Sequence, residues 1–340
     1  MRILGLLLAL VSGPVHAVTP RWITPDLFVA TDESVSPAEA RVTDCRAQIA
    51  RAICLVDPAA DPGAATERPC LPGSQAYAWH FERLYDAFPR PLRRMFCSLR
   101  RIHVEKSFFG TAYAGLLTDA SGKIVGAQIG IRRSVLDEAL SLAHWASWKE
   151  QLSWGGVTQD YTLTAGLPLA VSKAPGSVND FLFFVVAHEL GHVFDFANRL
   201  NRCTVGEAMG EAECELHPES WGALSWIRTA TPRARNEFAN RKGLCFYWCK
   251  GNPLPASAMQ QVYADLHYQT DFLSTYATTQ PWDDFADSLA YVLAVDGLGA
   301  SYRLRTPHGS YDVGAKVRSR RFAGKRAYIR RFLRGPIVYP

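Results

Sequence analysis

An apolar run in the middle of the chain, Phe181–Ala187, leads without a break into the motif H-E-L-G-H at residues 188–192. Ser177 and Asp180, just before the run, form the S-x-x-D signature of a helix start. A helix with apolar residues on all sides has to be buried in protein. The fold must therefore enclose one helix that carries two histidines and a glutamate.

The spacing within H-E-L-G-H predicts a metal site. Residues four apart lie above one another on a helix, so His188 and His192 can reach one ion at ~2.0–2.1 Å. Glu189 then lies beside the metal-bound water and can accept its proton. In the alternative, these are core residues without a metal, and a buried, unpaired Glu189 costs several kcal/mol. We therefore predict a catalytic Zn²⁺ with His188 and His192 as ligands and Glu189 as general base.

A catalytic zinc also needs a third protein ligand, and two candidates remain open. Glu211 follows His192 after eighteen intervening residues, a spacing seen in several aminopeptidase-type enzymes, but it lies in a glutamate-rich stretch. Asp283 and Asp287 are four apart on a predicted helix among apolar residues, where carboxylates need a partner. Asp283 could bind the metal and Asp287 the second nitrogen of a ligand histidine. Alternatively, Asp283 is a favourable charge at a helix N-terminus.

The stretch H-E-L-G-H-x-x-D ends at Asp195, and Tyr276 precedes the segment D-D-F-A-D at residues 283–287. These residues resemble the gluzincin-type zinc metallopeptidases of the lethal-factor-like kind, which carry H-E-[FL]-G-H-x-x-D and later Y-x(6)-E-x-F-A-E. The resemblance covers about twenty motif positions within roughly residues 110–300. Aspartate stands at two positions where that family has glutamate.

The resemblance implies an α+β fold of the zincin-like kind, in which a small mixed sheet packs on the H-E-x-x-H helix and a mainly helical lower half follows. It implies specific roles: metal ligands His188, His192 and Asp283, general base Glu189, oxyanion donor Tyr276, and supporting residues Asp287 and Asp195. His267 is an alternative oxyanion donor, although a single histidine beside Tyr268 is more typical of a structural role.

These features favour a zinc metallopeptidase that hydrolyses peptide bonds in a peptide or protein substrate. One alternative is an inactive protein that keeps the zincin fold and binds anionic components of the cell envelope, with the aspartate replacements marking lost activity. Another is a zinc amidase that acts on cell-wall peptides and shares the same site.

The first seventeen residues predict export. Arg2, the apolar run Ile3–Val11 and the ending Val15-His16-Ala17 are typical of a cleaved secretory signal. The run is too short for the ~20 residues of a membrane-spanning helix, so we expect a secreted or periplasmic protein without a transmembrane segment. Eight cysteines, all beyond residue 44, are then expected in disulfides. The four at residues 45–97 should pair among themselves, and likewise the four at 203–249, for which a four-thiolate zinc site is the alternative.

We expect four regions: a signal peptide at 1–17, a loop-rich disulfide-stapled region at 18–109, a catalytic domain at 110–300 with a cysteine-bounded insertion at 203–249, and a basic tail at 301–340. Periodicity and turn signals predict regular elements. The expected helices cover residues 75–86, 91–102, 134–151, 256–268, 283–295 and a tail segment within 318–334, and the expected strands cover 112–118, 123–131 and 161–171. The strand near residues 127–131 could offer an edge to an extended peptide.

The charge of the chain is unevenly distributed. Residues 301–340 contain eleven lysines and arginines against Asp312 as the one acid, whereas residues 18–300 carry a net charge of −6. The tail could bind an anionic envelope surface. Alternatively, its charged face is solvated or pairs with the acidic body. We expect no nucleic-acid partner.

Overall fold

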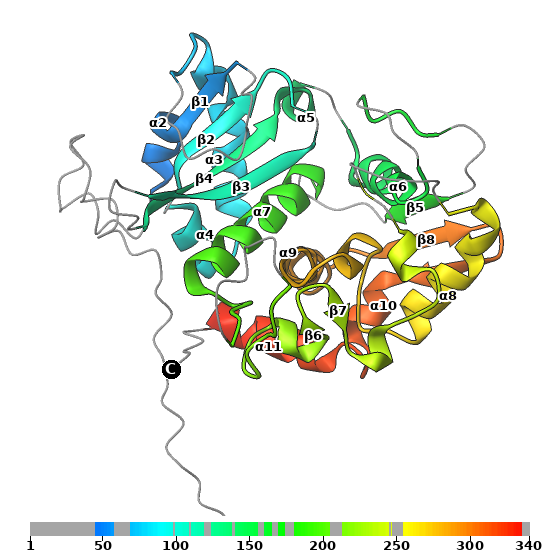
Figure 1. Ribbon diagram of the computed structural model, residues 1–340. Helices are drawn as coiled ribbons and strands as arrows, with labels where there is room; N and C mark the ends of the chain where they lie inside the picture. Colours follow the sequence, from blue (N-terminus) through cyan, green and yellow to red (C-terminus); the bar gives the residue numbers. More distant parts are fainter. Residues whose placement is uncertain are drawn as a thin grey trace, which may run out of the picture.

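The helix with the H-E-L-G-H motif, α7 (Asp180–Asn198), lies between a β-sheet and helix α9 (Pro281–Val292) in this computed structural model (Figure 1). The structure describes residues 45–57, 69–97, 99–108, 110–118, 124–137, 140–155, 160–164, 169–173, 180–204, 213–244, 246 and 254–334. The other α-helices are α2 (Ile49–Ala52), α3 (Ala78–Ala87), α4 (Arg90–Phe96), α5 (Arg133–Asp137), α6 (Leu142–Leu152), α8 (Met259–Tyr268), α10 (Val313–Arg318) and α11 (Ala323–Arg334). The strands are β1 (Ile53–Val56), β2 (Leu99–Glu105), β3 (Ala112–Thr118), β4 (Ile124–Arg132), β5 (Ala170–Lys173), β6 (Trp226–Arg228), β7 (Thr231–Pro232), β8 (Tyr302–Thr306) and β9 (Gly309–Asp312).

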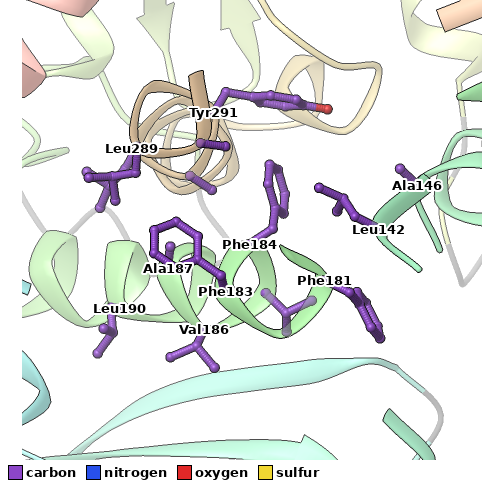
Figure 2. Close-up of a cluster of buried hydrophobic side chains, with 14 of the residues drawn as sticks. Leu142, Ala146, Phe181, Phe183, Phe184, Val186, Ala187, Leu190, Leu289 and Tyr291 are labelled. Carbon is purple, nitrogen blue, oxygen red and sulfur yellow. The ribbon is translucent and has the colours of Figure 1, made fainter. Parts of the chain in front are cut away.

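Helix α7 is buried because both of its long sides are apolar. From Phe181 to Phe194 every side chain is buried except that of His192, which is partly exposed. Figure 2 shows α7 with the sheet on one side and α9 on the other. In the contact between α7 and α9, the rings of Phe184 and Tyr291 meet edge to face with centroids 4.8 Å apart.

The main sheet has the strand order β1-β2-β4-β3, with β1, β2 and β4 parallel and β3 antiparallel. Its register places Ile102, Ile129 and Ala114 side by side on one face, which belongs to the same buried apolar cluster as α7. The predicted antiparallel strand pair is confirmed as β3 and β4. The expected peptide-binding edge near residues 127–131 is wrong, because β4 pairs on both sides and β3 forms the edge.

Three other local expectations are wrong in part. The helix expected at 91–102 ends at Phe96, and β2 follows, because Arg101, His103 and Glu105 alternate with apolar residues that pair in the sheet. The helix expected at 134–151 is split, since Ser141 caps a new helix through the backbone N–H of His144 at 3.1 Å. The strand expected at 161–171 is confined, among the described residues, to β5.

Tyr161, at the start of that expected strand, has a φ of 61°, in the left-handed region that extended chains do not use. The helices expected at 75–86, 256–268 and 283–295 are confirmed by α3, α8 and α9, and the tail helix is confirmed by α11.

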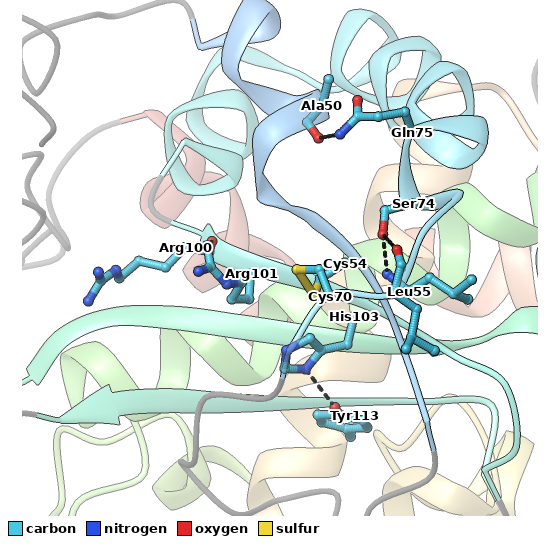
Figure 3. Close-up of a disulfide and its surroundings, with 11 residues drawn as sticks. Ala50, Cys54, Leu55, Cys70, Ser74, Gln75, Arg100, Arg101, His103 and Tyr113 are labelled. Carbon is cyan, nitrogen blue, oxygen red and sulfur yellow. Dashed lines mark hydrogen bonds between the residues drawn. A yellow bond between two sulfur atoms is a disulfide. The ribbon is translucent and has the colours of Figure 1, made fainter. Parts of the chain in front are cut away.

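The expected pairing of the first four cysteines is confirmed, with disulfides Cys45–Cys97 and Cys54–Cys70. Figure 3 shows the second bond beside Ser74, whose hydroxyl accepts from the Leu55 N–H at 2.9 Å. A third disulfide joins Cys203 to Cys214, and Cys245 and Cys249 lie outside the described residues. Three disulfides fit an exported protein. The expected signal peptide also lies outside the described residues.

Strands pair across two of the expected region boundaries. β1 and β2, from the N-terminal region, join β4 in one sheet, and β8, from the basic tail, pairs with β5. The described residues therefore form an α+β fold with a small mixed sheet, as predicted, and the described part of the expected basic tail, up to residue 334, belongs to its packing. Within the described residues, no helix has both the length and the apolarity to cross a membrane.

Gly191 lets α7 and α9 approach closely. A Cβ atom placed on Gly191 would lie 2.8 Å from the Cα atom of Ala286 in α9. This contact is too short for two carbon atoms, so the backbones of the two helices would have to move apart. We therefore expect Gly191→Ala to lower the free energy of unfolding by about 1–3 kcal/mol. The matched control is Gly324→Ala in α11, where nothing lies within 4 Å. Urea unfolding should show that control to be unchanged or slightly more stable, and equal effects of both changes would contradict the close-contact argument.

Candidate metal centre

The two histidines of α7 meet at their Nε2 atoms. They lie one helical turn apart, and His188 Nε2 is 3.1 Å from His192 Nε2. His188 is 5% exposed and the side chain of His192 is 11% exposed. Burial, together with the charge of His188, holds the pKa of His192 well below its usual value. His192 is therefore neutral, the form in which an imidazole binds a metal.

Helix α9 brings Asp283 to this pair from nearly one hundred residues further along the chain. Pro281 at the start of α9 is well suited to the first turn of a helix, and Asp283 follows in that turn. Asp283 Oδ1 lies 3.5 Å from His192 Nε2. Its Oδ2 accepts from Thr279 Oγ1 at 3.0 Å and from Gln280 Nε2 at 2.8 Å. Those two donors orient the carboxylate so that Oδ1 faces the histidines.

Asp287, one turn further along α9, supports His188 from behind. Its Oδ1 lies 2.8 Å from His188 Nδ1, and its Oδ2 accepts from the hydroxyl of Ser274. Burial acts to raise the pKa of Asp287, but Lys149 and His188 outweigh it and hold the pKa at about 2. A carboxylate at Nδ1 favours the tautomer with the proton on Nδ1, which leaves Nε2 with a lone pair for a metal.

The donor set fits a divalent metal ion. The ligand atoms of His188, His192 and Asp283 all lie within 4.8 Å of one another; His188 and Asp283 are buried, and the His192 side chain is 11% exposed. Two Nε2 lone pairs and one carboxylate oxygen converge there, and without a cation the carboxylate would be costly to bury. Accordingly, burial raises the pKa of Asp283 in the metal-free chain. Two imidazoles with one carboxylate are a typical ligand set for zinc with an open fourth position.

Glu189 lies beside the His-His-Asp cluster but is not part of it. The side chain is buried, and burial raises its pKa to about 7 against the opposing charges of His188 and Lys149. It lines a pocket of about 40 Å³ together with His188 and Tyr276. A carboxyl group in such a place can exchange a proton with a reacting water near neutral pH.

Tyr276 comes from a short 3₁₀ turn, Tyr276–Thr278, just before α9. Its ring centroid lies 6.0 Å from that of His188, so the ring borders the site. Lys149 Nζ of α6 lies 3.9 Å from the centroid of the same ring. Lys149, Ser274, Thr279 and Gln280 were not among the residues predicted for the site. For Thr279 and Gln280, the available signal was their position immediately before a helix with buried carboxylates.

The remaining predicted residues lie elsewhere. Asp195 faces the turn after α7, where its carboxylate accepts from the backbone N–H of Asn201 at 2.9 Å and from the Asn201 side chain. Burial raises its pKa to about 7. His267 of α8 borders a different small pocket with Tyr311 and Lys316, and burial lowers its pKa to about 4. Glu211 lies outside the described residues.

Comparisons with protein-family models, with curated proteins and with solved structures found no match to this chain. The site is therefore described by its own geometry: a buried His-His-Asp group with a glutamate beside it.

Proposed function

We propose that this chain is an exported zinc metallopeptidase with a zincin-like catalytic domain. The observation that carries the proposal is the convergence of His188, His192 and Asp283 from two helices, with Glu189 buried beside them. Asp287 lies against Nδ1 of His188, the nitrogen that faces away from the metal position. A carboxylate at that nitrogen is common in metal sites, where it orients the histidine ligand. The resemblance to gluzincins of the lethal-factor-like kind assigns the same residues the same roles.

A zinc ion held by His188, His192 and Asp283 would supply a Lewis acid that polarises a peptide carbonyl and acidifies water. Glu189 accepts the proton of the attacking water and returns it to the leaving amine. The Tyr276 hydroxyl donates a hydrogen bond to the carbonyl oxygen as that oxygen becomes negative. Strand β3, which pairs with β4 on one side only among the described strands, aligns the extended peptide by main-chain hydrogen bonds.

The direct test of this proposal is hydrolysis of an unfolded protein by the purified chain. Activity should appear with zinc bound, disappear when a chelator removes the metal, and return after stoichiometric zinc is added. A chain that binds zinc but hydrolyses neither an unfolded protein nor a cell-wall peptide would support the alternative of an inactive zincin-like protein.

A second candidate function, binding to an anionic envelope surface, is favoured by a groove of about 630 Å³ on α10 and α11. Its lining includes five arginines: Arg318, Arg326, Arg330, Arg331 and Arg334. Asp296 pairs with two of these, Arg326 at 2.8 Å and Arg330 at 3.0 Å, so the groove keeps a net positive charge. Part of the basic tail thus pairs with the acidic body, and part lines an exposed, arginine-rich groove that supports the proposal of anion binding.

Charge reversal at the groove tests this binding without removing packed elements. We expect Arg331→Glu with Arg334→Glu to weaken binding to vesicles that contain phosphatidylglycerol by about 30-fold, at about 1 kcal/mol per basic residue lost. Cosedimentation at low and high salt measures the effect. Arg51→Glu with Arg228→Glu, at exposed sites that do not line the groove, is the matched control. Equal binding by both double variants would exclude the groove.

A further inference from the structure

Lys149 is a cation beside the candidate site that the mechanism above does not use. It lies on α6 and its side chain is 13% exposed. The ammonium faces two aromatic rings, with the centroid of Tyr276 at 3.9 Å and that of Trp145 at 5.1 Å. Lysine is rarely buried to this degree without a paired anion, because its charge loses hydration.

The nearest carboxylate does not complete that pairing. Lys149 Nζ lies 3.9 Å from Asp287 Oδ1, well beyond the 2.7–2.9 Å typical of a charge-assisted hydrogen bond. Asp287 Oδ1 lies closer to His188 Nδ1, at 2.8 Å, and its Oδ2 accepts from the Ser274 hydroxyl. The aromatic faces attract the charge but offer no lone pair. In the described part of the chain, no hydrogen-bond acceptor is within bonding distance of the three ammonium donors.

The ammonium borders the place where a substrate would lie. Lys149 lines the small pocket of about 40 Å³ that also includes Glu189 and Tyr276. Thr111 and Ala112, at the start of the edge strand β3, complete one side of this pocket. A group that enters it therefore lies next to both the general base and the strand that aligns the peptide. The volume suits the end of a short side chain better than an aromatic ring.

We propose that this pocket binds the carboxylate of an acidic substrate residue, aspartate or glutamate, next to the bond that is cleaved. The inference rests on the proposed function and specifies its substrate class. The Lys149 ammonium supplies the charge and the hydrogen-bond donors, while Tyr276 and Trp145 limit the competing water. A neutral residue at that position, such as glutamine, offers the ammonium only an uncharged acceptor, so the charge-assisted hydrogen bond is lost.

Binding to a protein that cannot turn over substrate tests this preference independently of activity. The protein is the zinc-loaded Glu189→Gln variant, and the probes are peptide pairs that differ by one glutamate or glutamine at each position flanking the cleavage site. At one position we expect the glutamate peptide to bind at least tenfold more tightly. Adding Lys149→Met should bring the ratio to about one, and Lys149→Glu should favour a lysine peptide. Lys242→Met, at an exposed lysine, is the matched control and should keep the ratio.

Two results would overturn the substrate assignment. One is equal affinity for the paired peptides at every position. The other is a loss of affinity in Lys149→Met that is the same for both peptides, which would make Lys149 a positioning residue for Tyr276 and Asp287. Hydrolysis by the unmutated chain separates the two proposals: a clear glutamate preference in binding without any cleavage supports the pocket and contradicts the peptidase function.

Discussion

Replacing Glu189 with glutamine should lower kcat for peptide hydrolysis by a factor of about 10²–10⁴, the usual contribution of a general base. The amide matches the carboxylate in size but cannot accept the proton of the attacking water. Because Glu189 is not one of the three candidate metal ligands, the variant should bind zinc as well as the unmutated chain does. Metal analysis and hydrolysis rates on the same preparation measure both quantities.

The control for this change is Glu219→Gln, because the Glu219 side chain is 58% exposed and pairs with Arg202 at the surface. It should leave both zinc content and rate within about twofold of the original, since surface ion pairs contribute little. Full hydrolysis by the Glu189→Gln protein would show that the proposed proton transfer is wrong, even if zinc is bound.

Replacing Lys325 with methionine should lower the free energy of unfolding by about 3–5 kcal/mol, because it leaves buried carboxylates without their cation. Lys325 Nζ from α11 donates to Asp284 Oδ1 at 2.7 Å and lies 2.9 Å from Asp271 Oδ1. Its side chain is 2% exposed, and that of Asp284 is fully buried. Burial raises the pKa of Asp284 to about 7 despite Lys325, so without this cation the carboxyl group would be harder still to keep charged.

Urea unfolding of the chelated, metal-free chain measures this effect without a contribution from zinc binding. Adding Asp284→Asn to Lys325→Met should recover part of the lost stability, because it removes the buried charge left without a cation, whereas Asp271 keeps Arg235 at 3.6 Å. Arg331→Met, an exposed change on the same helix, should stay within about 0.5 kcal/mol. A Lys325→Met protein as stable as the original would show that this buried pair does not hold α11 to α9.

The residues that could be predicted are those whose signal is local. His188, Glu189 and His192 are close in sequence and share one helix, so their spacing alone predicts that their side chains lie close together. Asp283 and Asp287 could be predicted because two carboxylates four apart in an apolar helix need partners. The structure brings both to the histidines: Asp283 to His192 and Asp287 to His188.

The residues that could not be predicted depend on tertiary contacts. Lys149 belongs to α6, and only the packing of α6 beside α7 and the turn at Tyr276 gives it a place at the site. Lys325 belongs to a strongly basic helix, where the pattern favours solvent exposure, yet it is buried against carboxylates from two distant segments. β2 was missed because Leu92, Met95 and Leu99 continue a helical period that the parallel pairing with β1 and β4 overrides.

The most direct test of the His-His-Asp centre is the zinc content of the purified chain and of its ligand variants. We expect about one zinc ion per unmutated chain, and near-complete loss on His192→Ala or Asp283→Ala after dialysis against a weak chelator. Glu211→Ala should retain the ion, because Asp283 supplies the third ligand. An unmutated chain without bound metal, or an Asp283→Ala protein that keeps its zinc while Glu211→Ala loses it, would contradict the His-His-Asp centre.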